Sequence, residues 1–209
     1  LCHKAGIQVV MITGDHPLTA FAIARNLGIA KSEQQVITGK ELDEMDEETL
    51  AQHVQSYCVY ARVTPEHKVR IVNAFKKHQL VVAMSGDGVN DAPSLKNADI
   101  GIAMGKSGTD VCKQASDMIL ADDNFATIVE AVEQGRNIYL NIQKAVLYLL
   151  SCNLGEIMSL FLAIVCMPHV VSTLSAIQIL WVNLVTDAFP ALALGVDPMD
   201  KFIMEIGRA

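Results

Sequence analysis

The stretch that decides the fold is Ser85-Gly86-Asp87-Gly88-Val89-Asn90-Asp91-Ala92-Pro93, which directly follows the apolar run Leu80–Met84. A strand that ends in two carboxylates, Asp87 and Asp91, suits Mg²⁺, a hard cation that prefers oxygen ligands. Gly86 and Gly88 allow a tight backbone path close to an anion, and Asn90 can form hydrogen bonds without adding charge. A surface turn rich in Asp, Gly and Asn is the alternative for a short piece of this stretch. The whole nonapeptide instead predicts a loop that binds phosphate and magnesium.

Around this loop, short β-rich runs alternate with helical patterns through residues 1–124. Strands are predicted at Ile7–Ile12, Val59–Ala61, Leu80–Met84, Ile100–Ala103 and Asp117–Leu120. Helices are predicted at Pro17–Leu27 (begun by Asp15 or His16 and ended by Gly28), at residues 41–56, at 65–78 after the cap Thr64, and at 94–97. This alternation indicates βαβ crossovers and a parallel sheet, so the predicted fold class is α/β.

Ligands bind such sheets at the carboxyl ends of the strands. Thr13-Gly14-Asp15 follows the first predicted strand, so the Thr13 hydroxyl and the Gly14 amide could hold phosphate oxygens, although alone this tripeptide would predict a plain turn. Lys68 could place a cation on a phosphate. A lone helix lysine is normally solvated, so this prediction depends on the neighbouring loops. His67 is predicted to be a surface histidine rather than a catalyst.

After Asn124 the chain changes character. Phe125–Lys144 is a helical pattern that continues into the apolar segment Ala145–Met167, and after Pro168-His169 a second apolar segment, Val170–Gly195, follows. Each segment is long enough to span about 30 Å of hydrocarbon at a rise of about 1.5 Å per residue. The chain therefore predicts a membrane hairpin, with a buried soluble hairpin as the alternative.

The flanking charges favour the membrane hairpin. Arg136 and Lys144 precede the first segment, and Lys201 and Arg208 follow the second, whereas the short connector has no Lys or Arg. The positive-inside rule therefore places both outer ends, and the soluble region, in the cytoplasm.

Polar groups interrupt both apolar segments. In the first segment, Asn153 and Glu156 are three residues apart on one helix face. In the second segment, one face carries Asn183, Thr186 and Asp187. An acid in hydrocarbon costs several kcal/mol unless it faces protein, water or an ion, so the cluster predicts an oxygen-rich cation site of the kind Ca²⁺ uses. A structural polar contact between helices is the alternative. Unwinding or kinking at Gly155 and Pro190 could free carbonyl ligands, whereas Tyr148 and Trp181 are expected to be packing or interfacial residues.

Composition excludes several classes of protein. The formal net charge of −7 argues against a nucleic-acid-binding surface. The five cysteines are scattered without a C-x-x-C pair, so neither a zinc site nor a disulfide framework is indicated, and a reducing cytosol fits the soluble part. The chain has no initiator Met and no signal peptide, and it is expected to be a fragment of a longer protein.

Three motifs, TGD at 13–15, TPEHK at 64–68 and GDGVNDAP at 86–93, resemble those of the P-type cation-transporting ATPases, and the resemblance covers essentially the whole chain. It implies that residues 1–124 are part of a phosphorylation domain, a Rossmann-like parallel sheet of the haloacid-dehalogenase type. A stalk helix (125–144), a transmembrane α-helical hairpin (145–195) and a cytosolic loop (196–209) would follow. The hairpin looks like the fifth and sixth transmembrane helices of the family.

The resemblance also implies roles for single residues. Thr13, Gly14 and Lys68 would contact the phosphoryl group, and Asp87 would ligate Mg²⁺. Two more residues of that loop would support it and the phosphate, namely Asn90 and Asp91. Asp15 and Arg62 would lie on the nucleotide side, so Mg²⁺ and ATP are the implied cofactors.

The hairpin resembles calcium pumps of the sarcoplasmic-reticulum type. Asn153 and Glu156 match the fifth-helix ligands of those pumps, and Trp181–Asp187 is similar to their sixth-helix ligand run. Sodium–potassium pumps usually carry Asp where this chain has Asn183, which favours calcium. The final residues, Phe202–Ala209, depart from the proline-rich continuation of the family.

No Asp-Lys-Thr-Gly sequence occurs in the chain, so the aspartate that accepts phosphate from ATP in this family is absent and the fragment is expected to be inactive alone. The predicted function is that of a parent protein, a multi-pass ATP-driven pump that couples aspartyl-phosphate formation and hydrolysis to Ca²⁺ transport. Its partners would be the transported cation, the lipid bilayer and the remaining domains of the pump. The alternatives are a pump for Na⁺, K⁺, H⁺ or Mn²⁺, a soluble haloacid-dehalogenase-type phosphatase, and a non-catalytic ion-binding membrane fragment.

Overall fold

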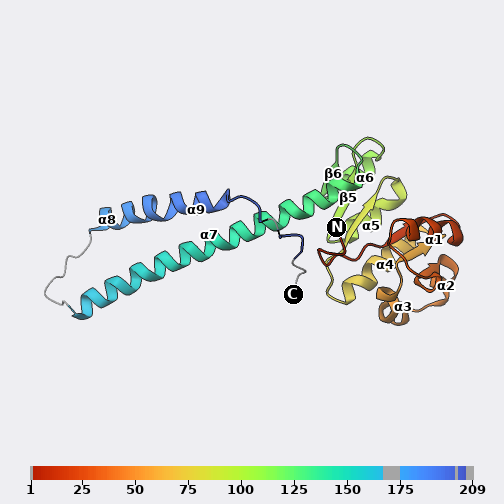
Figure 1. Cartoon of the computed structure of the whole chain (residues 1–209), viewed down its shortest axis with the longest axis horizontal. Coiled ribbons are helices and arrows are strands. Elements are labelled where there is room, and N and C mark those ends of the chain that lie inside the picture. Colours follow the sequence, from red (N-terminus) through yellow and green to blue (C-terminus); the bar gives the residue numbers. More distant parts are fainter. Residues whose placement is uncertain (1, 167–174, 201, 206–209) are drawn as a thin grey trace. The chain divides into compact units, whose positions relative to one another are not determined.

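The computed structural model describes residues 2–166, 175–200 and 202–205. They form two compact units, an N-terminal unit over Gly6–Ile128 and a helical unit that begins at Val129 and includes His3–Ala5. Figure 1 labels the α-helices of both units. The start of the second predicted apolar segment, residues 170–174, lies outside the described residues.

Six short strands in the described part of the N-terminal unit form two parallel three-stranded sheets, with the orders β1-β3-β2 and β4-β5-β6. The strands are β1 (Met11–Thr13), β2 (Val36–Thr38), β3 (Val59–Ala61), β4 (Ala83–Gly86), β5 (Ile100–Met104) and β6 (Met118–Leu120). Every ladder is parallel, which confirms the predicted α/β class. The sequence predicts one sheet, whereas the described structure has two, because β1 and β4 do not pair with each other. The two sheets are still in contact, since Ile12 of β1 packs against the cluster that contains Met84 of β4.

The ladders begin later than the apolar runs predict. β1 covers only the end of the predicted strand Ile7–Ile12, and β4 begins at Ala83. The register explains the shift in β4, because its partner strand begins opposite Ala83, at Ile100. Leu80 and Val81 precede that ladder and are 42% and 61% exposed. Gly86 is the last residue of β4, so the loop begins at Asp87.

The helices of the N-terminal unit are α1 (Pro17–Asn26), α2 (Gly39–Glu44), α3 (Glu47–His53), α4 (Pro65–Lys77), α5 (Ala92–Asn97) and α6 (Asp110–Ala115), with 3₁₀ turns η1 (Glu33–Gln35), η2 (Val54–Ser56) and η3 (Val89–Asp91). The predicted helix starts at His16 and Thr64 are confirmed, because each side chain accepts a backbone N–H of its first turn. Gly28, at φ +72°, follows the end of α1 as predicted.

Three parts of this unit differ from the sequence prediction. The acidic segment 41–56 is interrupted, because Met45 is extended and the Asp46 carboxylate accepts the Thr49 N–H to begin α3. Neither β2 nor α6 is predicted, since one is a three-residue strand between polar neighbours and the other a six-residue helix. Both elements are short enough that tertiary packing decides them rather than periodicity.

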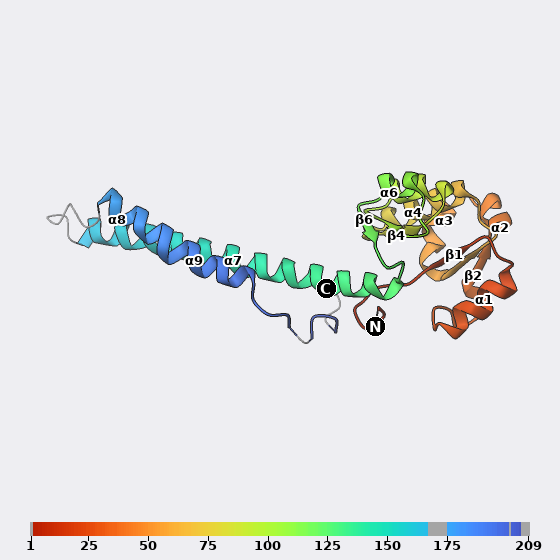
Figure 2. The same cartoon turned by 90° about the horizontal axis from the view of Figure 1, so that it is seen from above.

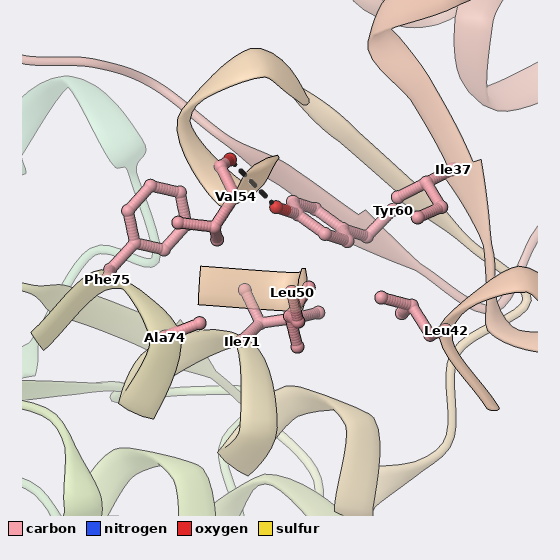
Figure 3. Packing of buried hydrophobic residues seen from close by; sticks show 8 residues of the cluster. All are labelled: Ile37, Leu42, Leu50, Val54, Tyr60, Ile71, Ala74 and Phe75. Carbon is pink, nitrogen blue, oxygen red and sulfur yellow. Dashed lines mark hydrogen bonds between the residues drawn. The ribbon is translucent and has the colours of Figure 1, made fainter. Parts of the chain in front are cut away.

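A cluster of eight buried side chains joins α2, α3 and α4 to the first sheet (Figure 3). At its centre, the Tyr60 hydroxyl donates a hydrogen bond of 3.1 Å to the Val54 carbonyl, and burial raises the pKa of Tyr60 well above its ordinary value. Ile71 and Phe75 contribute the face of α4. Each such side chain stabilises the fold by roughly 1.5–3 kcal/mol through burial, so the cluster holds in place the helix that carries Lys68.

The helical unit is a pair of long apolar helices. α7 (Phe125–Cys166) is 42 residues long and continues through Gly155 without a break. The second run consists of α8 (Ala176–Trp181), the π-helical segment η4 (Val182–Asp187) and α9 (Ala188–Gly195). The two runs lie side by side in both views (Figures 1 and 2). A π-helical segment therefore stands where the sequence predicts part of an α-helix.

Candidate phosphate and cation sites

The loop after β4 separates its two aspartates. Asp87 is exposed, and its carbonyl accepts a hydrogen bond of 3.0 Å from the Thr109 N–H. Asp91 is only 6% exposed. A Cβ on Gly86 would lie 2.5 Å from the Asp91 Cβ, so this position requires glycine for the loop to close. The loop thus leaves the Asp87 carboxylate exposed to solvent and buries that of Asp91.

Asp91 is paired with Lys68, from the start of α4. The Lys68 ammonium donates to one Asp91 carboxylate oxygen, and the Gly88 N–H donates to the other at 3.3 Å. The Ser94 hydroxyl, in α5, donates to the Asp91 carbonyl at 2.8 Å. The two side chains of the pair are 21% and 9% exposed. The structure therefore brings together the Thr64–Lys68 motif and the Asp87–Asp91 loop, two of the three predicted motifs.

The third motif lies at the carboxyl end of β1. The Thr13 hydroxyl donates to the Asp15 carboxylate at 3.0 Å and accepts from the Asp15 N–H at 3.1 Å. A Cβ on Gly14 would meet no atom within 4 Å, so the space beside this exposed backbone is open. The Val63 N–H donates to the Thr13 carbonyl at 3.4 Å, which connects this turn to exposed Arg62 at φ 53°.

Among the described residues, no hydrogen bond joins Thr13–Asp15 directly to Asp87–Asp91. The connection between them is the apolar contact of Ile12 with the cluster below β4. Asn90 lies in η3 and is exposed, as Asp87 is. Thr13, Gly14, Asp87 and Asn90 thus remain accessible to a ligand, whereas Asp91 is occupied by partners of its own chain.

The exposed Asp87 carboxylate fits Mg²⁺ as a ligand. Mg²⁺ keeps several waters and is usually bound through one or two carboxylates together with substrate phosphates. In residues 2–166, 175–200 and 202–205, no three His, Cys, Asp or Glu side chains gather as a complete metal site. A single exposed carboxylate at this loop would leave the other Mg²⁺ positions to waters and phosphate oxygens.

Two supporting contacts were not predicted. The prediction that His67 is a surface residue is wrong: the imidazole is 5% exposed and lies 2.7 Å from the Asp43 carboxylate. Cys112, in α6, is fully buried, and its thiol donates to the Gly88 carbonyl. Asp43 and Cys112 lie outside the three motifs, and no local sequence pattern indicates either contact.

In the helical unit, the acid of the first helix meets the amide of the second. With its nitrogen toward α7, the Asn183 amide donates to both Glu156 carboxylate oxygens, at 3.1 and 3.0 Å. Glu156 also lines a cavity of 440 Å³ whose other walls are mostly apolar: Gly155, Ser159, Leu160, Ala163, Ile179 and Val182. The predicted neighbours Glu156 and Asn183 therefore lie together between the two helices.

The other predicted cation ligands are placed differently. Asn153 is exposed, and its amide donates to the Leu149 carbonyl of its own helix at 2.8 Å. Within η4, Thr186 is exposed whereas Asp187 is buried, so the π-helical segment does not give them equal surroundings. One carboxylate oxygen of Asp187 is buried without a hydrogen-bond partner in the described part of the chain.

Tyr148 has a more specific contact than the predicted packing role. Its hydroxyl donates to the Thr186 carbonyl at 2.7 Å. In a regular helix that carbonyl would accept the N–H of residue 190, but Pro190 has none. The proline therefore frees a carbonyl beside the predicted ligand run, as the sequence suggests, and Tyr148 occupies it.

Both helices, α7 and Ile177–Gly195, are long and apolar enough to cross a membrane, with mean hydropathies of 1.9 and 1.5 in their most apolar 18-residue stretches. Their most apolar stretches are 0% and 6% buried within the described structure. At the polar end of the pair, Lys144 forms an ion pair with Asp197 at 2.5 Å, and the Asn141 amide donates to the Asp197 carbonyl at 2.9 Å. These contacts hold the segment after α9 against α7.

Known proteins match both parts of the chain. A model of haloacid dehalogenase-like hydrolases matches residues 1–99, and a model of the C-terminus of cation transporting ATPases matches residues 171–207. Calcium-transporting ATPase 1 of Bacillus cereus is 58% identical over 98% of this chain, and the calcium-transporting ATPase of Bacillus subtilis is 52% identical over 98%. Calcium-transporting ATPase 1 of Lactococcus lactis is 52% identical over 97%. The chain spans 23% of the length of each of these relatives.

Proposed function

The chain belongs to the P-type cation-transporting ATPases, and from this premise we propose that it is the part of an ATP-driven calcium pump that joins a phosphate-binding site to part of the cation site. The observation that carries the proposal is the pairing of Glu156 with Asn183 between two apolar helices. An acid and an amide in hydrocarbon are costly unless they serve an ion or a polar partner. The three named relatives are all calcium-transporting ATPases.

In the phosphate-binding half, Thr13, Gly14 and Lys68 would hold oxygens of the transferred phosphoryl group. Asp87 would hold Mg²⁺, which offsets negative charge on that group when bound, and Asn90 would support it from the same loop. Asp91 orients Lys68 through their ion pair. Asp15 and Arg62 would face the nucleotide, ATP.

The acceptor aspartate would come from the rest of the parent protein. The edges of β1 and β4 pair with no other described strand, yet Ile12 and the Met84 cluster are in contact. A further parallel strand beside either edge would bring an aspartate to the carboxyl ends where Thr13 and Asp87 lie. Without it the chain has no nucleophile for phosphoryl transfer, so we expect it to be inactive alone.

In the membrane half, Ca²⁺ is the substrate. Asn153, Glu156, Asn183, Thr186 and Asp187 would supply oxygen ligands, and other parts of the parent would complete the six to eight that Ca²⁺ takes. For this, the Asn183 amide would turn its oxygen toward the ion. The hairpin would be two of several spans, with the phosphate-binding half in the cytoplasm, because Arg136 and Lys144 precede α7's apolar part and Lys201 and Arg208 follow α9.

Coupling would use α7, since one unbroken helix runs from Phe125 to Glu156 and beyond. Phosphorylation would shift that helix between two arrangements and so change the cation site, a coupling that requires both sites to bias the same element.

The test is ATP-dependent ⁴⁵Ca²⁺ uptake into vesicles by the full-length parent. We expect Glu156→Gln and Asp187→Asn each to abolish uptake, and Glu130→Gln, an exposed acid of α7 outside the apolar stretch, to leave it unchanged. Phosphorylation triggered by another cation without ⁴⁵Ca²⁺ uptake would keep the family and overturn calcium as the substrate. A parent that stays in the aqueous fraction without detergent would favour a soluble phosphatase.

A further inference from the structure

The start of α4 is closed by an imidazole. The Thr64 hydroxyl accepts the His67 N–H at 3.4 Å, and in return the Thr64 N–H donates to His67 Nδ1 at 3.1 Å. This is a capping box in which histidine takes the place of the usual Glu or Gln. The next residue, Lys68, donates its own N–H to the Thr64 carbonyl at 3.3 Å, so the direction of the Lys68 side chain depends on this turn.

The box works with only one form of His67. Because Nδ1 accepts from Thr64, the ring proton must be on Nε2, and Nε2 lies 2.7 Å from the Asp43 carboxylate. A carboxylate at one ring nitrogen fixes which nitrogen carries the proton. If the proton moved to Nδ1, two N–H groups would face each other and the turn would open.

α2, which carries Asp43, is held tightly against the same turn. A Cβ on Gly39, the first residue of α2, would lie 2.3 Å from the Arg62 carbonyl oxygen and 3.1 Å from His67 Nδ1. Leu42, one turn further along α2, lies in the core cluster (Figure 3) and anchors the helix there. Asp43 is therefore held at His67 although its own side chain is 68% exposed.

We propose that Asp43 and His67 form a positioning relay, in which Asp43 fixes the ring proton of His67 so that His67 holds the turn that directs Lys68 to the phosphoryl group. The proposal rests on the proposed function of Lys68. Neither Asp43 nor His67 touches the phosphoryl group; both act through Thr64 and Lys68. α2, which contains none of the three motifs, thereby becomes part of the phosphate site.

The test uses the full-length pump, phosphorylated from inorganic phosphate in the absence of calcium. Asp43→Ala should raise the phosphate concentration for half-maximal phosphoenzyme about fivefold, the size expected when one ordinary intramolecular hydrogen bond is lost. Asp43→Asn keeps an acceptor for Nε2–H and should change it less than about twofold. Half-maximal activation by Ca²⁺ should be the same in all variants.

Asp46→Ala is the matched control. Asp46 is three residues further on, caps α3 through Thr49, and has no contact with His67 or Lys68 among the described hydrogen bonds. It should lower the thermal midpoint as Asp43→Ala does while leaving the phosphate dependence unchanged. An Asp43→Ala pump with the wild-type phosphate dependence, or one that changes only as much as Asp46→Ala, would overturn the relay but not the pump. A wild-type pump that forms no phosphoenzyme would overturn the proposed function, and the relay with it.

Discussion

Two aspartates of this chain are almost equally buried and differ in what surrounds them. Asp91, at the phosphate loop, is 6% exposed, and Asp187, in the apolar hairpin, is 5% exposed. The Asp91 carboxylate has Lys68 at one oxygen and the Gly88 N–H at the other. One oxygen of Asp187 is buried with no hydrogen bond from any described residue.

Under the proposed function, this difference separates a charge that stabilises the fold from a charge that binds the transported cation. A buried carboxylate is tolerated when it is paired and hydrogen-bonded, which is the condition of Asp91. Asp187 lacks that compensation from the described residues, and an incoming cation would supply it. The Asp91 carboxylate is therefore compensated within its own unit, whereas Asp187 keeps one buried oxygen without a partner among the described residues, as the proposed cation site requires.

The largest expected effect comes from breaking the ion pair between Asp91 and Lys68. Asp91→Ala leaves the Lys68 ammonium poorly compensated, and removal of one partner from a buried ion pair costs about 3–5 kcal/mol of unfolding free energy. Asp187→Asn should not destabilise the chain, because it removes the negative charge of a carboxylate that has one buried oxygen without a partner among the described residues. Thermal unfolding of the chain in detergent, followed by circular dichroism, measures both. If the two variants lose stability equally, the comparison fails.

A second contrast concerns glycines in the two units. Gly86→Ala would place a Cβ 2.5 Å from the Asp91 Cβ, whereas Gly155→Ala would meet no atom within 4 Å. Overpacking of this kind costs roughly 1–3 kcal/mol, so Gly86→Ala should lower the unfolding midpoint and disturb the Asp91–Lys68 pair. Gly155→Ala should be neutral or stabilising by up to about 1 kcal/mol, since alanine favours helix. The same unfolding assay distinguishes them, and a tolerated Gly86→Ala would show that the loop can relax.

What the sequence predicts well is local. Thr64 and Pro65 predict the start of α4, and His16 and Gly28 predict both ends of α1, because capping depends on residues within one turn. The loop after β4 follows from its own nine residues. The order of the strands cannot be predicted in this way, because the pattern of apolar residues does not indicate which strands are neighbours.

What the sequence does not predict depends on distant partners. Asp43 and His67 are 24 residues apart, and only the packing of α2 on the core brings them together. Tyr148 and Thr186 are 38 residues apart. Half of this contact can be predicted from the sequence, because Pro190 cannot donate to the Thr186 carbonyl. The other half cannot, because the donor that replaces it, Tyr148, belongs to another helix.

A smaller effect is expected from that contact. Tyr148→Phe removes the hydrogen bond to the Thr186 carbonyl and keeps the ring. Hydrogen bonds between membrane helices contribute about 0.6 kcal/mol on average, so the apparent calcium affinity of the full-length pump should fall by roughly threefold. Calcium-dependent phosphorylation by ATP measures it. Ser159→Ala is the control, because the Ser159 hydroxyl donates only to the Gly155 carbonyl of its own helix; an equal loss in both variants would argue against a role for the Thr186 carbonyl.

The smallest expected effect concerns Asp123, a half-buried carboxylate that has a hydrogen bond at each oxygen. The backbone N–H of Lys106, together with that of Ser107, lowers the pKa of Asp123 from 3.8 to about 2. Since the folded-state pKa is depressed, the stability that Asp123 contributes is fully present above about pH 4 and is lost as the pH falls through about 2. Acid unfolding of the chain between pH 5 and pH 2 should therefore include a contribution from this loop.

Asp123→Asn tests that contribution without disturbing the backbone. Asp123 has φ 57°, a conformation that asparagine also adopts readily, and the amide oxygen can still accept one of the two N–H groups but cannot ionise. The variant should be slightly less stable than the wild type at pH 7, and the difference should shrink as the pH approaches 2, where about half of the wild-type carboxyl is protonated. If the stability difference between the wild type and Asp123→Asn stays constant between pH 5 and pH 2, the negative charge of Asp123 does not stabilise the fold. Its charge would then resemble that of Asp187, for which the described residues provide no compensation.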